Sequence, residues 1–270
     1  MSRWSNDGWI KLANSPSDLL PHYFESRDGY RLAWREMGQG RPFVLLHGFF
    51  STAFVNWIRY GHAEKIAARG YRLIMPDLRG HGDSAKPHDS EAYPPDILAD
   101  DGLALVDHLG LENYDLGGYS LGARIVVRMH VLGARPRRMM IAGMGLTGLT
   151  DLAGRADHFR HILTHLGEHE RGSPEWMAEA FLKTVDGDPQ ALLQILNVFT
   201  DTPASALAAI DVPTLVLAGD EDRDNGSHEA LAALLPNAAH VEVPGGHMSC
   251  IVKSEFGAAI AHWLGDAADI

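Results

Sequence analysis

Cysteine is almost absent from this chain of 270 residues, with Cys250 as its single occurrence. One thiol forms no internal disulfide and supplies no cysteine-cluster metal site. Basic residues are also scarce, because 23 lysines and arginines stand against 35 aspartates and glutamates, for a net charge of −12. Nucleic acids and anionic membranes require a clustered basic face, so the sequence predicts neither as a partner.

Long apolar runs are missing as well. No stretch of the sequence reaches the roughly 20 apolar residues that cross a bilayer, and residues 1–20 contain no apolar core of signal-peptide length. We therefore expect a cytoplasmic protein. The sequence leaves open whether it forms a homodimer, and it assigns no role to residues 1–20.

What the chain does contain is an alternation of short apolar runs with helical patterns, which is typical of βαβ units in a mostly parallel sheet. A hairpin around Asp28-Gly29 is expected to precede these units. The predicted strands are 22–25, 31–36, 42–46, 71–75, 114–118, 138–142, 214–218 and 239–243, and the predicted helices are 55–69, 96–109, 121–132, 227–235 and 254–264.

Residues 143–213 have an almost wholly helical pattern. A crossover between parallel strands needs about a dozen residues, or one helix. The surplus predicts a helical cap over residues 148–203, inserted after the sixth strand. Residues 1–147 and 204–270 would then form the core.

The strongest chemical signal is Gly118-Tyr119-Ser120-Leu121-Gly122, between a predicted strand and a predicted helix. The pattern G-x-S-x-G in that context places a nucleophilic serine on a sharp turn. Ser120 is therefore the predicted nucleophile, and the backbone amide of Leu121 is one half of a predicted oxyanion hole. The segment His47-Gly48-Phe49-Phe50 directly follows another strand, and the amide of Phe49 is the predicted second half.

Two later loops complete the pattern of a catalytic triad. A serine hydroxyl is a weak nucleophile, so it needs a base, and His247 follows strand 239–243. The imidazole in turn needs a carboxylate to orient it. The loop after strand 214–218 offers three candidates: Asp220, Asp222 and Asp224. Loops at the carboxyl ends of parallel strands meet at one edge of a sheet, so these side chains can converge.

With these motifs, the chain resembles the α/β-hydrolase fold superfamily from Tyr23 to Leu264. The matching segments are His47-Gly48-Phe49, Asp77 to Ser84 (a D-x-R-G-x-G-x-S loop), the serine turn, Gly219-x-x-Asp222 and Gly246-His247. The resemblance implies a twisted, mostly parallel eight-stranded sheet flanked by helices, a helical lid and a Ser–His–Asp triad. It selects Asp222, three residues after Gly219, as the acid.

Departures from related branches narrow the predicted reaction. Ser120 stands where epoxide hydrolases and dehalogenases of this fold have aspartate, which disfavours an alkyl-enzyme ester. Tyr119 stands where C–C-bond hydrolases often have Asn or His, and no Trp follows His247. The sequence thus predicts a serine hydrolase for a small ester or lactone, with no metal or cofactor. C–C hydrolysis, acyl transfer or perhydrolysis, and a non-catalytic ligand-binding role are the competing hypotheses.

Apolar side chains near the site and on the cap are expected to shape the substrate pocket. They are Phe50, Tyr119, Phe159, Met177, Phe181 and Met248. Four histidines follow one another at helical spacing in the cap region: His158, His161, His165 and His169. We expect them to form the solvent face of one cap helix; a metal site or a pH-sensitive lid is the competing hypothesis. Cys250 is expected to be a small packed residue.

Overall fold

The computed structural model describes residues 19–151 and 153–265; residues 1–18, to which the sequence assigned no role, lie outside this range. Eight strands form one sheet in the order β1-β2-β4-β3-β5-β6-β7-β8. They are β1 (His22–Glu25), β2 (Arg31–Met37), β3 (Arg41–Leu46), β4 (Tyr71–Pro76), β5 (Asp115–Tyr119), β6 (Met139–Ala142), β7 (Thr214–Gly219) and β8 (Ala238–Val243). Strand β2 pairs antiparallel with β1 and β4, and all other pairs are parallel. The expected fold class is confirmed.

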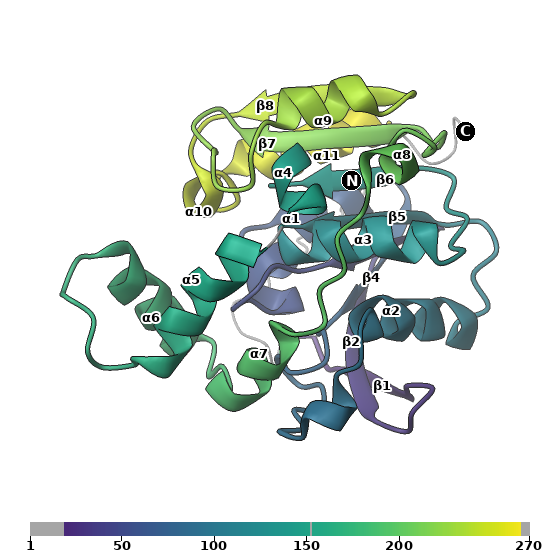
Figure 1. Cartoon of the computed structure of the whole chain (residues 1–270). Coiled ribbons are helices and arrows are strands. Elements are labelled where there is room, and N and C mark those ends of the chain that lie inside the picture. Colours follow the sequence, from purple (N-terminus) through teal and green to yellow (C-terminus); the bar gives the residue numbers. More distant parts are fainter. Residues whose placement is uncertain (1–18, 152, 266–270) are drawn as a thin grey trace, which may run out of the picture.

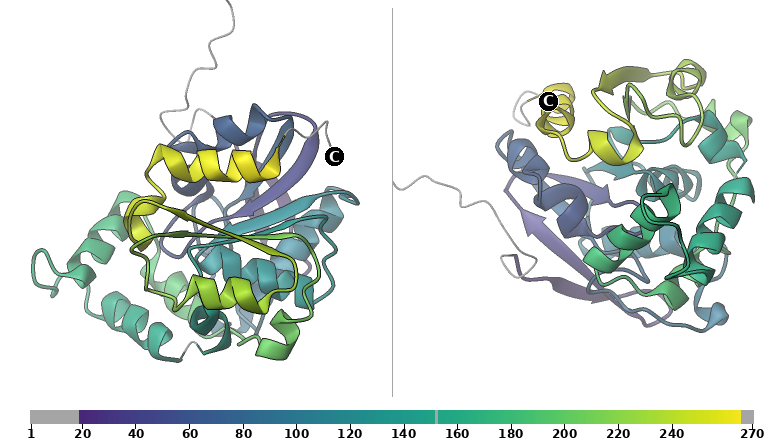
Figure 2. Two further views of the ribbon diagram at one scale, coloured as in Figure 1. Left: turned by 90° about the horizontal axis from the view of Figure 1, so that it is seen from above. Right: turned by 90° about the vertical axis from the view of Figure 1, so that its left-hand side faces the viewer.

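Helices cover both faces of this sheet, and the layers follow from the alternation of side chains along the buried strands. On β3, Phe43 and Leu45 belong to one buried cluster, and Val44 and Leu46 belong to the other. Figure 2 (left) shows α11 on one side of the strands and α9 on the other. The helices outside the segment between β6 and β7 are α1 (His62–Ala67), α2 (Ile97–His108), α3 (Leu121–Val131), α9 (His228–Leu234), α10 (His247–Cys250) and α11 (Ser254–Leu264), with a short 3-10 turn, η3 (Ser90–Ala92).

The single helix predicted over residues 55–69 is wrong, because the segment forms two elements. A π-helical segment, η2 (Phe54–Ile58), comes first, and α1 begins at His62. Gly61 between them has φ of 75°, in the left-handed region that favours glycine and ends a right-handed helix. Trp57, in η2, is fully buried in the cluster on the α11 side of the sheet.

The segment between β6 and β7 contains the helices that the sequence predicted there. They are α4 (Leu146–Thr150), α5 (Ala153–Thr164), α6 (Pro174–Thr184), α7 (Pro189–Ile195) and α8 (Ala204–Leu207). Helices α5, α6 and α7 lie at the same end of the sheet as α10 (Figure 1). We call these three helices the inserted helices. Helix α4 is attached to the core instead, since the amide of Gly148 donates to the carbonyl of Asn225 at 2.8 Å.

Within the described part of the chain, no helix has both the length and the apolar character required to cross a membrane.

Candidate active site

Ser120 occupies the sharp turn between β5 and α3. Its backbone has φ of 53° and ψ of −111°, an uncommon conformation for a residue with a side chain. Its amide donates to the carbonyl of Ala142 at 2.8 Å, and its own carbonyl accepts from the amide of Arg124 at 3.2 Å. These bonds to β6 and to the first turn of α3 hold the strained turn in place.

The two glycines of the motif allow the chain to pack closely around Ser120. A Cβ atom on Gly118 would lie 2.2 Å from the carbonyl carbon of Gly122. A Cβ atom on Gly122 would lie 2.2 Å from the carbonyl oxygen of Leu46, at the end of β3. Both distances are shorter than any real contact, so the turn requires glycine here. The start of α3 therefore lies directly against the segment that begins with His47.

A chain of hydrogen bonds joins Ser120, His247 and Asp222. The Nε2 atom of His247 lies 3.0 Å from the Oγ atom of Ser120, and its Nδ1 atom lies 2.8 Å from Oδ2 of Asp222. The side chains of His247 and Asp222 are only 8% and 4% exposed. With both ring nitrogens engaged, His247 is positioned to accept the serine proton while a carboxylate stabilises the resulting positive charge.

Of the three candidate carboxylates, the structure brings Asp222 to His247. Asp220 instead accepts a hydrogen bond from the amide of Gly245 at 2.7 Å, which ties the acidic loop to the loop that carries His247. The amide of Asp224 donates to Oδ1 of Asp222 at 3.1 Å. Burial by itself raises the pKa of Asp222, but the hydrogen bond and charge of His247 and the Asp224 amide outweigh it and lower the pKa overall. Asp222 is thus held ionised beside the imidazole.

Tyr119 and Cys250 pack beneath His247. The hydroxyl of Tyr119 donates to the backbone carbonyl of His247, and it lies 3.5 Å from Sγ of Cys250. Both side chains are buried, and burial raises the pKa of the phenol and of the thiol. A buried thiol with a raised pKa carries little thiolate, so Cys250 is a packed residue, as expected.

His47 holds the turn after β3 in a fixed conformation. Its Nδ1 atom contacts the carbonyl of Gly48 at 2.8 Å, and the amide of Leu78 donates to its Nε2 atom at 3.0 Å. A carbonyl only accepts and an amide only donates, so the ring is the neutral Nδ1–H tautomer. Burial also lowers the pKa of His47. The amide of Gly48 donates to Oδ1 of Asn56 at 3.0 Å, which anchors the other side of the turn.

A cavity of about 160 Å³ opens beside Ser120. Its walls are Gly48, Phe49, Ser51, Val55, Asn56, Tyr60, Tyr119, Ser120, Phe181, His247, Met248, Ile251 and Val252. Three of the side chains expected to shape the pocket, Tyr119, Phe181 and Met248, are among them. Leu121, expected to contribute only its backbone amide, begins α3 next to Ser120, and the first amides of a helix have no partner within it.

Three other expected pocket residues lie outside this wall, so the expectation for them needs correction. The rings of Phe49 and Phe50 stack at 4.5 Å, and Phe159 packs edge-on against them at 5.0 and 5.4 Å. Phe50 and Phe159 therefore support Phe49 from behind. Met177 is 55% exposed on α6, one turn before Phe181, and it is not part of the cavity wall.

Sequence patterns did not indicate the wall residues of η2 and of the segment after α10. Val55 and Asn56 come from η2, and Ile251 and Val252 follow α10. Each stands a few residues after a recognised motif, namely the His47 turn or His247. Proximity to those motifs was the available signal. For Val55 and Asn56, the expectation of a single helix over residues 55–69 hid their proximity to the cavity.

The four histidines near α5 do not form one helix face, so that expectation is wrong. Helix α5 ends at Thr164, before His165 and His169. His158, His161 and His165 are exposed, whereas the side chain of His169 is 5% exposed and its Nε2 atom lies 3.1 Å from the carbonyl of Ile162. His169 therefore packs within the inserted helices, and the other three face solvent.

The chain is similar to known proteins in sequence and in fold. Residues 43–261 match the sequence profile of the alpha/beta hydrolase family. The non-heme haloperoxidase of Rhodococcus erythropolis is 28% identical over 268 residues, covering 86% of this chain and 95% of that protein. A hydrolase from Pseudomonas aeruginosa PA01 has a TM-score of 0.73 at 25% identity, over 91% of this chain and 98% of that one. The structure of Est816, described as an N-acyl homoserine lactone degrading enzyme, has a TM-score of 0.68 at 25% identity, over 90% of this chain and 100% of that one.

Proposed function

Since the chain belongs to the alpha/beta hydrolase family, we propose that it is a serine hydrolase that cleaves small carboxylic esters or lactones. The observation that carries the proposal is the hydrogen-bonded series Asp222–His247–Ser120 beside an accessible cavity. The base lies within hydrogen-bonding distance of both the nucleophile and the orienting acid.

In the first step, the Oγ atom of Ser120 attacks the carbonyl carbon of the substrate. His247 takes the serine proton at Nε2, which lies 3.0 Å from Oγ. The carboxylate of Asp222 stabilises the imidazolium that forms. His247 then gives the proton to the departing alcohol oxygen, which leaves an acyl group on Ser120. In a lactone, that alcohol stays attached to the acyl group.

The negative charge on the carbonyl oxygen needs donors in the tetrahedral intermediate. We assign this role to the amides of Phe49, in the turn after β3, and of Leu121, the first residue of α3. The contact between Gly122 and the carbonyl of Leu46 keeps these two segments together. Preorganised donors of this kind contribute about 3–4 kcal/mol each to transition-state stabilisation.

Water completes the cycle. His247 removes a proton from a water molecule, which attacks the acyl group, and the proton then returns to Ser120 as the acid leaves. Every proton and bond in this sequence is handled by side chains and amides of the chain itself. The proposal therefore includes no metal or organic cofactor.

The cavity wall favours a small apolar acyl or alcohol group. Phe49, Phe181, Met248, Ile251 and Val252 are among the apolar side chains that line it. The similarity to a structure described as a lactone-degrading enzyme supports including lactones among the substrates.

A second reaction at the same site has support from one comparison. The non-heme haloperoxidase covers 86% of this chain. If hydrogen peroxide replaces water in the second step, the acyl-enzyme yields a peracid and free Ser120. C–C hydrolysis, acyl transfer and ligand binding without turnover are the other competing hypotheses.

One experiment separates these reactions. The protein is labelled with a fluorophosphonate probe, and turnover is measured on p-nitrophenyl esters of graded chain length, on γ-lactones, and on acetate with hydrogen peroxide. Ser120→Ala is the matched control throughout. Labelling at Ser120 with ester or lactone turnover that disappears in the variant supports the proposal. Labelling at Ser120 with peracid formation but no ester or lactone turnover favours perhydrolysis. If the probe does not label Ser120, then Ser120 is not the nucleophile.

A further inference from the structure

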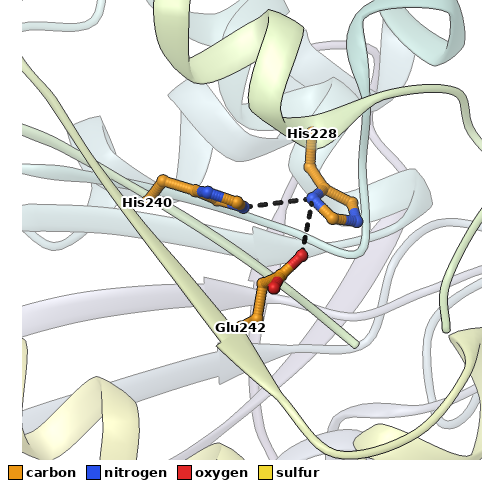
Figure 3. Close-up of side chains that lie close together, drawn as sticks. All are labelled: His228, His240 and Glu242. Carbon is orange, nitrogen blue, oxygen red and sulfur yellow. Dashed lines mark hydrogen bonds and ion pairs between the residues drawn. The ribbon is translucent and has the colours of Figure 1, made fainter. Parts of the chain in front are cut away.

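A cluster of metal-ligating side chains lies away from Ser120, at the edge of the sheet. His240 and Glu242 stand two residues apart on β8, so they project from the same face of that strand. Helix α9 packs along β8, and His228 is its first residue. Figure 3 shows the three side chains converging, with Nδ1 of His228 facing both His240 and Glu242.

The distances within the cluster match those between ligands of one small cation. Nδ1 of His228 lies 3.0 Å from Nε2 of His240 and 3.7 Å from Oε1 of Glu242. The ligand atoms of all three residues lie within 4.8 Å of one another. A tetrahedral zinc ion with bonds of about 2.0–2.1 Å separates its ligand atoms by about 3.3 Å. His240 and Glu242 are exposed, so both side chains have room to adjust toward that geometry.

We propose that His228, His240 and Glu242 bind a divalent transition metal of the zinc class. Two imidazoles and one carboxylate are a ligand set that suits such an ion. A second carboxylate is close by, because Oε2 of Glu229 lies 3.5 Å from Nδ1 of His228. Glu229 or water completes the coordination. The ion would link the start of α9 to the edge strand β8, which makes its role structural.

Arg223 controls the state of His228 when no metal is bound. Its Nη1 atom lies 3.3 Å from Nε2 of His228. A guanidinium only donates, so Nε2 accepts and the ring proton sits on Nδ1, where it is donated to Nε2 of His240. A metal on Nδ1 moves that proton to Nε2, where it faces the guanidinium. Arg223 therefore opposes metal binding, and it must turn away when the site is filled.

To test the proposal, the full-length protein is first stripped of metal with a chelator. It is then titrated with zinc chloride in a calorimeter. We expect one site per chain. His240→Ala and Glu242→Gln are suitable variants because both side chains are exposed, so their loss leaves the core intact. Each is expected to weaken zinc binding at least tenfold. Arg223→Met is expected to tighten it several-fold, which a merely structural histidine pair does not explain.

Two controls keep the outcome decisive. His165→Ala removes an exposed histidine elsewhere and should leave the affinity unchanged. Asp222, Asp224 and His247 also have the spacing of a metal site, so His247→Ala tests whether zinc binds there instead. Unchanged zinc binding in His240→Ala, or loss of binding in His247→Ala alone, overturns the proposal. An increase in melting temperature with zinc in the wild type, absent in His240→Ala, gives an independent reading.

Discussion

The side-chain hydroxyl of Tyr119 donates a hydrogen bond to the backbone carbonyl of His247, so the residue before the proposed nucleophile supports the proposed base from below. Tyr119→Phe removes this bond from a buried carbonyl, to which the weak thiol of Cys250 also donates at 3.8 Å. We expect a loss of about 1–3 kcal/mol in the free energy of unfolding. We also expect kcat to fall several-fold while KM changes little. The substitution loosens the position of the imidazole, whereas the phenylalanine ring preserves the shape of the pocket. A normal kcat with reduced stability would assign Tyr119 a structural role alone.

Substitutions at Asp222 and at Asp220 should have different effects on turnover and on stability. Asp222→Asn leaves the imidazole without a carboxylate and favours the wrong tautomer, so turnover is expected to fall by about 10⁴. Asp220→Ala removes the acceptor of the Gly245 amide, so it should cost about 1–3 kcal/mol of stability and far less turnover. Ester hydrolysis and chemical denaturation on both variants provide the comparison. The reverse pattern would make Asp220 the acid.

His62 makes the fold sensitive to acid. Its Nε2 atom lies 2.5 Å from the carbonyl of Ile251, and burial lowers its pKa to about 4. In the unfolded chain the pKa of this histidine is about 6.5. The contribution of neutral His62 to the free energy of unfolding is therefore fully present above that pH. It declines as the pH falls from about 6.5 toward 4, by about 3 kcal/mol in total.

The check is denaturation of the wild type and of His62→Gln at pH 7, 5 and 4. The variant keeps a donor for the carbonyl of Ile251 but has no charge to gain. Its stability should therefore fall less over this interval than that of the wild type. His47 and His81 are also buried with lowered pKa values, so part of the decline should persist. Equal declines in both proteins would rule out His62 as a source.

Gly122→Ala should destabilise the protein, although alanine is normally preferred to glycine in helices. Gly→Ala within a helix normally stabilises by about 1 kcal/mol. At Gly122 the new Cβ meets the carbonyl oxygens of Leu46 and His47 at 2.2 and 2.8 Å, so we expect a loss of about 3 kcal/mol or more. Gly102 in α2 is the control, because a Cβ there meets the flexible side chain of Met129 instead of backbone. Melting temperatures of the two variants should differ clearly, and similar values would contradict this explanation.

Local sequence patterns predicted the strands and the serine turn, and they placed Ser120, the acidic loop of Asp220 to Asp224 and His247 after strands of one sheet. Each of these depends on short-range features, such as a buried apolar run or a glycine pair, that the local chain determines. The sheet edge then brings the loops together by topology. The family resemblance, rather than the residues alone, distinguished Asp222 from Asp220.

The pocket wall was less predictable, because it depends on how helices rotate and end. Periodicity indicated one helix over residues 55–69, and the left-handed turn at Gly61 divides that segment. Met177 and Phe181 lie on the same helix, yet only Phe181 reaches the cavity. Which side chain faces the cavity is decided by long-range packing of α6 against the core, which no local pattern records.

The contact between Gly122 and the carbonyl of Leu46 also has an evolutionary consequence. It joins the serine turn to the turn that begins at His47, so a substitution that shifts one displaces the other. Phe181 on α6 and Met248 on α10 face the same cavity without sharing that contact. Adaptation to new substrates can therefore proceed through α6 and α10 by single replacements, while the turn and its partner change together or stay as they are.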